Sequence, residues 1–154
     1  MVLEPIRQVF RDDRREEAVI NALKENINNE WQFYKTPPFY FMDFHLTRRR
    51  ANGRENYLGD LEIKWLNAPA SMPTKFPFQK LAKILIAPPY SDHKTIFHRI
   101  CFRYNDGMLL IPAQELGGLV PEFTVRHDTG ERDLNIIFQV EDYAQHWLEL
   151  VVND

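Results

Sequence analysis

The sequence predicts a mixed α/β fold in which helices flank a mixed β-sheet. Two features support this prediction: apolar residues recur at helical spacing near the N-terminus, and several later runs are rich in aromatic and β-branched residues between turn sequences. A length of 154 residues with 44% apolar and 27% charged residues suits one globular domain with a sizeable core. We therefore expect a single domain over residues 1–154.

The first expected element is an amphipathic helix in the stretch RDDRREEAVINALKENI. Asp12 or Asp13 is a suitable N-cap, and acidic residues favour the first turn of a helix. Apolar residues follow at helical spacing, at Val19, Ile20, Leu23 and Ile27. The sequence KTPP at 35–38 prevents any continuation of a helix.

Two strands and a second helix are expected next. The aromatic run at 39–46 predicts one strand and the stretch at 56–66 another, and the loop between them contains Asn52-Gly53. A short connection of this kind favours an antiparallel hairpin. Residues 67–78 hold three prolines and predict a loop, and residues 78–87 predict a short helix that ends before two further prolines.

The remainder of the chain predicts two more hairpins and a final helix. One hairpin turns around Asn105-Asp106-Gly107, the other turns around the sequence DTGE at 128–131, and residues 141–152 show helical spacing. We expect a core over about residues 12–111, followed by a C-terminal hairpin and helix over 119–154.

Charge is distributed unevenly along the chain. The net charge is -3, yet residues 35–100 carry 11 basic and 5 acidic residues, whereas residues 101–154 carry 3 basic and 10 acidic ones. A basic region of this kind can attract phosphates on a slightly acidic protein, or folding can mix the segments on the surface.

No run is long and apolar enough to span a membrane, and the single Cys101 cannot form an internal disulfide. We expect a cytoplasmic protein in which Cys101 packs in the core.

The stretch NYLGDLEIKWL at 56–66 alternates charged and apolar residues. On a strand, Asp60, Glu62 and Lys64 would share one face. Asp43 stands in the middle of the preceding apolar run, where burial without a partner is costly. If the hairpin aligns these faces, Asp43, Glu62 and Lys64 converge. The alternative is an ordinary strand face in water, with Asp60 at a turn or at the start of the strand.

Converging carboxylates and a lysine suit metal-assisted hydrolysis of a phosphodiester. Two carboxylates from neighbouring strands can hold Mg²⁺, which prefers oxygen ligands and retains several waters. A bound metal lowers the pKa of water and stabilises charge that develops on the phosphate. Lys64 could orient the attacking water or neutralise that charge.

The pattern Asp43 … Glu62-Ile63-Lys64, placed between two helices, resembles the PD-(D/E)xK nuclease superfamily, which has a restriction-endonuclease-like core. The resemblance covers roughly residues 12–87, although Met42 stands where the family often has proline. It implies that Asp43 and Glu62 bind Mg²⁺, with Mn²⁺ as a substitute, and that Ile63 lends its carbonyl oxygen. Glu17 or Glu16 would match an acidic residue that some members carry on the first helix, and Gln79 would face the metal pocket as in some branches.

The resemblance implies an endonuclease that acts on double-stranded DNA. Cutting both strands would require at least a homodimer, because one small subunit carries one site. Contacts with DNA phosphates could come from a set of basic residues, namely Arg48, Arg49, Arg50, Arg54, Lys75 and Lys80. His45 could also contact substrate, or serve as a structural histidine. The second hypothesis is a non-catalytic nucleic-acid-binding or assembly protein with the same fold.

Overall fold

The computed structural model describes the backbone of residues 4–87 and 96–150, with side chains described from residue 14. The elements in chain order are α1 (Glu4–Asn26), β1 (Trp31–Lys35), β2 (Phe44–Arg49), β3 (Glu55–Trp65), β4 (Thr74–Pro77), α2 (Phe78–Ile86), β5 (Arg99–Arg103), β6 (Gly107–Pro112), the 3₁₀ helix η1 (Ala113–Leu116), β7 (Glu122–Val125), β8 (Arg132–Phe138), the 3₁₀ helix η2 (Val140–His146) and β9 (Trp147–Glu149).

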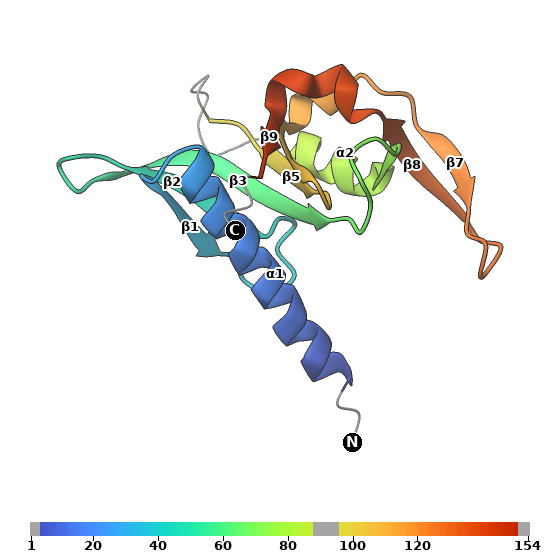
Figure 1. Ribbon diagram of the computed structural model, residues 1–154, viewed down its shortest axis with the longest axis horizontal. Coiled ribbons are helices and arrows are strands. Elements are labelled where there is room, and N and C mark those ends of the chain that lie inside the picture. The colour runs from blue at the N-terminus through green and yellow to red at the C-terminus, as the bar shows by residue number, and fades with distance from the viewer. Residues whose placement is uncertain (1–3, 88–95, 151–154) are drawn as a thin grey trace.

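The strands form two sheets, so the predicted mixed α/β class is confirmed (Figure 1). The larger sheet has six strands in the order β1-β2-β3-β5-β6-β9, and the smaller has three in the order β4-β8-β7. The pair β3–β5 is parallel, whereas its neighbouring pairs in the large sheet are antiparallel. The large sheet is therefore mixed, because the connection through β4 and α2 returns the chain in the same direction.

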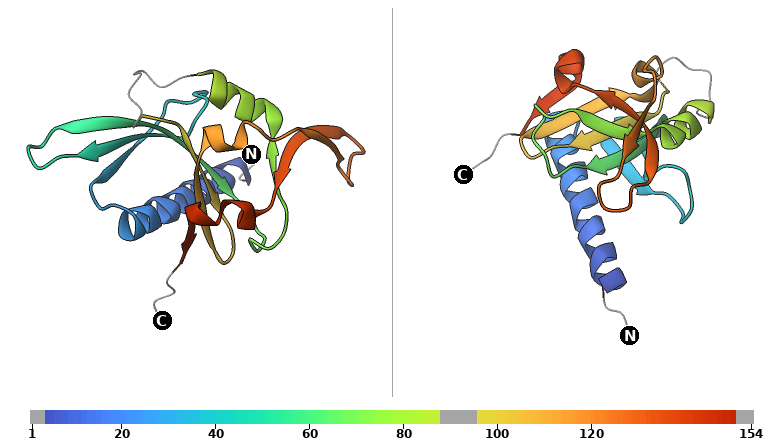
Figure 2. Two further views of the ribbon diagram at one scale, coloured as in Figure 1. Left: turned by 90° about the horizontal axis from the view of Figure 1, so that it is seen from above. Right: turned by 90° about the vertical axis from the view of Figure 1, so that its right-hand side faces the viewer.

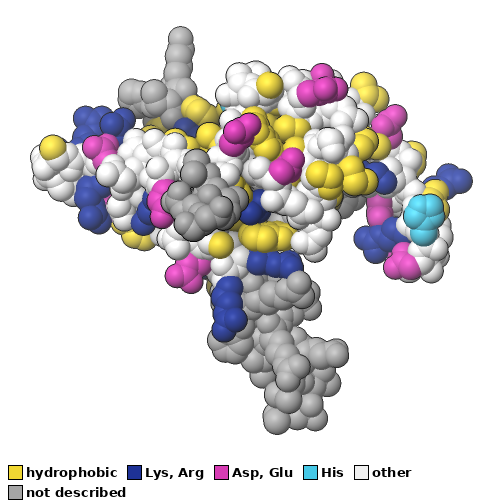
Figure 3. Space-filling model, in the orientation of Figure 1, with side chains coloured by type: hydrophobic (Ala, Val, Ile, Leu, Met, Phe, Trp, Pro, Cys, Tyr) yellow, Lys and Arg dark blue, Asp and Glu magenta, His cyan; other side chains and the backbone are white. Residues whose placement is uncertain are grey.

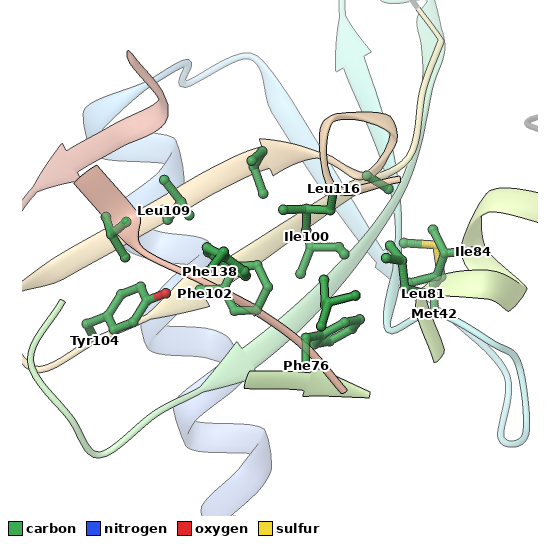
Figure 4. Close-up of a cluster of buried hydrophobic side chains, with 14 residues drawn as sticks. Met42, Phe76, Leu81, Ile84, Ile100, Phe102, Tyr104, Leu109, Leu116 and Phe138 are labelled. Carbon is green, nitrogen blue, oxygen red and sulfur yellow. The ribbon is translucent and has the colours of Figure 1, made fainter. Parts of the chain in front are cut away.

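The large sheet separates two apolar layers, and α1 and α2 lie on its opposite sides (Figure 2). On the α1 side, Val19 and Leu23 pack with Leu61 and Cys101. On the other side α2 and the small sheet cover a cluster that includes Ile100, Phe102, Phe76 and Leu81 (Figure 4). Alternation along β5 explains the division, since Ile100 and Phe102 face one layer and Cys101 the other.

Several predicted elements are confirmed. The hairpin of the first two predicted strands is β2–β3, the helix predicted at 78–87 is α2, and both later hairpins form as β5–β6 and β7–β8. Cys101 is buried in the core as expected. None of the helices within the described ranges is long and apolar enough to cross a membrane.

Other boundaries were wrong. Helix α1 begins at Glu4 rather than at Asp12 or Asp13, because Pro5 is compatible with the first turn of a helix and nothing between it and Asp12 breaks the helix. The strand predicted at 39–46 begins only at Phe44, after an irregular segment in which Phe39 has a φ of 68°. Asp43 therefore precedes β2 instead of lying within a strand.

Two short strands were missed, and the predicted C-terminal helix does not form. β1 lies just before the two prolines and pairs with β2, and β4 lies inside the predicted proline-rich loop and pairs with β8. The C-terminal segment forms η2, which is kinked at Tyr143, and then β9, which pairs with β6. Pairing with the open edge of β6 has replaced the helix that the local spacing favoured.

Candidate metal centre

The candidate site lies at the place where β3 extends past its neighbour β2. The register pairs Phe44, the first residue of β2, with Leu61, so the last residues of β3, from Glu62 to Trp65, have no β2 partner. The main-chain N–H of Asp43 donates to the carbonyl of Leu61 at 3.1 Å, and Oδ2 of Asp43 accepts the N–H of Ile63 at 2.8 Å. The Asp43 side chain therefore satisfies the free edge of β3 where a strand would otherwise do so.

A pocket of about 260 Å³ opens at this edge. Its lining residues are Arg15, Glu16, Asp43, Glu62, Ile63, Lys64 and Trp65. The structure thus brings together Asp43, Glu62, Ile63 and Lys64 with Glu16, the second of the two acidic residues considered on the first helix. Glu17 is exposed and is not part of the lining, because consecutive residues of a helix point in different directions.

Glu62 is a largely buried carboxylate with incomplete hydrogen bonding. Its side chain is 13% exposed, and its Oε1 lies 3.4 Å from Nζ of Lys80. Its Oε2 is buried and makes no hydrogen bond within the described part of the chain. Burial, followed by the negative charge of Asp43, raises the pKa of Glu62 to about 7, although Lys80 opposes the shift. An unsatisfied buried carboxylate beside a second carboxylate is an environment that favours a bound cation.

Several cationic side chains surround the pocket. Lys80 was predicted to contact DNA, but its ammonium pairs with Glu62 on the α2 side of the sheet. Lys35 pairs with Glu16 at 2.8 Å, and the guanidinium of Arg15 lies 5.3 Å from the centre of the Trp65 ring. Of the basic side chains, Arg15 and Lys64 line the pocket itself, so these two are placed to contact an anionic ligand there.

The donor set fits a hard cation with few protein ligands. Within residues 4–87 and 96–150, no group of three or more His, Cys, Asp or Glu side chains is arranged to hold a metal. A metal here would therefore be coordinated by the carboxylates of Asp43 and Glu62, together with a main-chain carbonyl oxygen and water molecules. Mg²⁺ commonly binds through one or two carboxylates and keeps several waters, so this set fits Mg²⁺ better than zinc.

Asp60 has a different place from the one expected of it. It is neither a turn residue nor a solvated strand residue, because it is 1% exposed within β3. Its carboxylate accepts hydrogen bonds from Tyr57 at 2.7 Å and Tyr40 at 2.8 Å, and it lies 2.7 Å from Nδ1 of His45. His45 is therefore anchored to Asp60, which satisfies the buried charge.

His98 completes this buried network. Its Nδ1 accepts the main-chain N–H of Asp60 at 3.1 Å, so the ring proton must reside on Nε2, which lies 2.6 Å from the carbonyl oxygen of Ala87. Gly59, which precedes Asp60, has a φ of 114°, and a Cβ there would collide with the carbonyl of Phe97. The pairing of β3 with β2 skips Leu58 next to this glycine, which makes a β-bulge. A glycine directly before an acidic residue in a strand was the sequence signal for the bulge, but the partners of Asp60 come from distant segments.

The remaining predicted basic residues lie outside the pocket. The four arginines predicted to contact DNA are exposed around the tip of the β2–β3 hairpin, which projects from the body in Figure 1. Figure 3 shows basic side chains at the same end of the molecule. Arg48 pairs with Glu30 and Arg49 with Glu55, while Arg50 and Arg54 flank the turn. Lys75 is exposed on β4.

Gln79 does not face the metal pocket. It lines a separate pocket of about 360 Å³ between the start of α2 and the β7–β8 hairpin, together with Pro77, Phe123, Arg126, Arg132, Asp133, Leu134 and Asn135. That larger pocket lacks a buried unsatisfied acid, so the smaller one at the edge of β3 is the better candidate for chemistry.

A scan of family models, a search of curated proteins and a search of solved structures each returned no match to this chain.

Proposed function

We propose that this protein is a Mg²⁺-dependent DNA endonuclease of the PD-(D/E)xK type. One observation carries the proposal: Asp43 and the buried, incompletely satisfied Glu62 line one pocket with Lys64, at the free edge of β3. The Asp … Glu-x-Lys pattern needs its two halves on adjacent segments, and here Asp43 stands directly before β2 while Glu62 and Lys64 lie on the neighbouring strand β3.

The order of elements supports the same proposal. The resemblance implies a helix, strands that carry the acidic residues, a second helix and then further strands, and α1, β1–β3, α2 and β5–β6 follow that order. Because β5 returns parallel to β3, α2 is brought across the sheet, and Lys80 at its start reaches Glu62. The fold therefore supplies charged groups from three separate elements to one edge.

The residues would divide the work as follows. Asp43, Glu62 and the Ile63 carbonyl would hold the cation, whose chemistry is to acidify a bound water and neutralise charge on the scissile phosphate. Asp43 is fixed for this role by its hydrogen bond from the Ile63 N–H. Lys64, on the same pocket, would orient the water or the phosphate by charge-assisted hydrogen bonds.

Lys80 would have a supporting role. Its ammonium lies 3.4 Å from Oε1 of Glu62, and it favours the ionised form of that carboxylate. It would therefore keep Glu62 able to bind metal, a role different from the DNA contact expected from sequence.

Plasmid cleavage tests this proposal. We expect the wild-type protein to nick or cut supercoiled DNA with Mg²⁺ or Mn²⁺, and we expect no cleavage with EDTA. Glu62→Gln and Lys64→Ala should each lower the rate by about 100-fold or more. Glu62→Gln keeps the size of the side chain, and burial already favours the neutral form of Glu62. This variant should therefore fold.

Lys83→Ala is the matched control, because Lys83 is an exposed lysine on α2 that does not line the pocket. Cleavage at the wild-type rate in Glu62→Gln and Lys64→Ala would contradict the site. Absence of cleavage on every DNA and RNA form, with binding intact, would favour the non-catalytic binding protein.

A further inference from the structure

Strand β7 is an edge strand on a hairpin that projects from the body. It lies at the outer side of the small sheet, whose order is β4-β8-β7, and within the described ranges it pairs with β8 alone. Figures 1 and 2 show the β7–β8 hairpin at the end of the molecule opposite the β2–β3 hairpin. An uncovered edge of this kind presents main-chain donors and acceptors that can pair with another strand.

The face of β7 that continues the core is apolar yet uncovered. The register places Phe123 opposite Leu134 on β8, and Ile136 and Phe138, which share the face of Leu134, are buried in the core. Beyond the body of the protein the same face carries Phe123 at 71% exposure and Val125 at 58%. Apolar side chains on an open strand edge are the combination that most soluble proteins avoid unless the edge has a partner.

The main-chain groups that face the open edge can be identified. Arg126, next along the chain, donates its N–H to the carbonyl of Glu131 on the β8 side. Since main-chain groups alternate in direction along a strand, those of Thr124 also face β8, and those of Phe123 and Val125 face outward.

We propose that β7 pairs in antiparallel fashion with β7 of a second copy of this chain, with the two-fold axis at Thr124. Phe123 then lies opposite Val125 of the partner subunit, and each such pair exchanges both of its outward main-chain hydrogen bonds. The aromatic side chain meets a β-branched one on the apolar face, a favourable cross-strand combination.

Charge is complementary in the same register. Glu122 lies opposite Arg126 of the partner subunit, and this pair shares the polar face with Thr124. Arg126 already pairs with Asp133 of its own chain at 2.6 Å, so the guanidinium would bridge two carboxylates.

Other registers are poorer. A shift toward the N-terminus sets Pro121, which has no N–H, in an outward-facing position opposite Val125 of the partner subunit. A shift toward the C-terminus sets Phe123 against position 127, which lies in the turn rather than the strand. The self-pairing centred on Thr124 is therefore the one that uses the whole strand.

This dimer rests on the strand edge alone and does not depend on the proposed nuclease activity. Its short ladder predicts a weak, concentration-dependent association. If both proposals hold, the dimer carries two copies of the site related by a two-fold axis, as cutting both strands would require.

The test is cross-linking through Thr124→Cys, combined with analytical ultracentrifugation of the wild type over a range of concentrations. Residues directly opposite each other in a non-hydrogen-bonded antiparallel pair have Cα atoms about 4.5 Å apart, which a disulfide can span. The native Cys101 is fully buried and burial raises the pKa of its thiol to about 12, so it will not compete. We expect a disulfide-linked dimer under mild oxidation, and a reversible dimer of the wild type.

Two variants serve as a matched pair. Phe123→Lys should abolish both the reversible dimer and the cross-link of Thr124→Cys, because it places a charge on the apolar face of the pairing edge. Ile86→Lys, at a residue 79% exposed on α2, should leave both unchanged. A wild type that stays monomeric at every concentration would overturn the proposal. So would a dimer in which Thr124→Cys cross-links no faster than Thr129→Cys at the hairpin tip.

Discussion

At the scale of single residues, the fold disfavours the negative charge of the Glu62 carboxylate when no metal is bound. Its pKa lies near 7 rather than at the ordinary 4.5, chiefly because the carboxyl is buried and secondly because Asp43 is negative. Between these two values the folded chain binds a proton that the unfolded chain has released. Stability should therefore fall as pH rises through this window, by on the order of 3 kcal/mol at most.

We predict that Glu62→Gln abolishes this fall in stability with rising pH. In the presence of a chelator, the free energy of unfolding of the variant minus that of the wild type should increase from pH 5 to pH 8. Urea denaturation at both pH values measures the difference. Adding Mg²⁺ at pH 8 should then stabilise the wild type and leave the variant unchanged. Parallel pH profiles for the two proteins would show that Glu62 is not held in this environment.

Asp60 shows the opposite condition, a buried carboxylate with full hydrogen bonding. Asp60→Asn would place an amide NH₂ among groups that donate to the native carboxylate, namely those of Tyr40, Tyr57 and His45. We expect a loss of roughly 2–4 kcal/mol in the free energy of unfolding. Denaturant titration beside Asp142→Asn, an exposed aspartate, measures it. A loss equal to that of the control would mean that the network contributes little.

At the scale of elements, the β2–β3 hairpin and its arginines would approach DNA if the proposed nuclease activity holds. Arg54 stands directly before β3 and eight residues from Glu62. In an extended strand this separation corresponds to a distance of about 26 Å between the two residues. A two-stranded ribbon of that kind fits the major groove of B-DNA, where it would contact DNA some distance from the proposed cleavage site.

We predict that Arg50→Ala and Arg54→Ala together weaken DNA binding on all sequences alike. Each lost phosphate contact should reduce the slope of log K against log salt by about 0.9. Fluorescence anisotropy over a salt series measures both effects. Arg132→Ala, on the hairpin at the other end of the molecule, is the control, and an equal change in its slope would show that the arginine hairpin has no special role.

Much of the element order could be predicted from sequence, and the reasons for the failures are physical. The apolar spacing at 19–27, 56–66 and 78–87 predicts these elements clearly, because each of them buries one face in the core. β1, β4 and β9 are only three to five residues long, and each exists because a partner strand offers an edge. No local pattern signals such pairing, so the C-terminal segment was expected to be helical.

The candidate site was predictable to a similar degree. Asp43, Glu62 and Lys64 meet because Asp43 stands directly before β2 and the β2–β3 hairpin places it beside β3, so sequence could predict that they meet. The contact of Lys80 with Glu62 depends on how α2 crosses the sheet, and the hydrogen bonds of Asp60 depend on segments around Tyr40 and His98. Neither of these long-range contacts leaves a trace in the local sequence.

At the scale of the whole molecule, the candidate metal site lies where β3 extends past β2. A hairpin projects at each end of the molecule (Figures 1 and 2). The β2–β3 hairpin carries arginines that suit phosphates, whereas the β7–β8 hairpin carries an apolar edge flanked by Glu122 and Arg126, which suit another copy of the chain. The proposed chemistry, DNA contact and self-association would therefore occupy three separate parts of one fold.

Anomalous diffraction from crystals of the protein grown with Mn²⁺ would show whether the pocket binds a metal. We expect an anomalous peak between the carboxylates of Asp43 and Glu62, with the Ile63 carbonyl as a further ligand, and no peak there in Glu62→Gln. An anomalous peak elsewhere, or an empty pocket at saturating Mn²⁺, would contradict the proposed metal site.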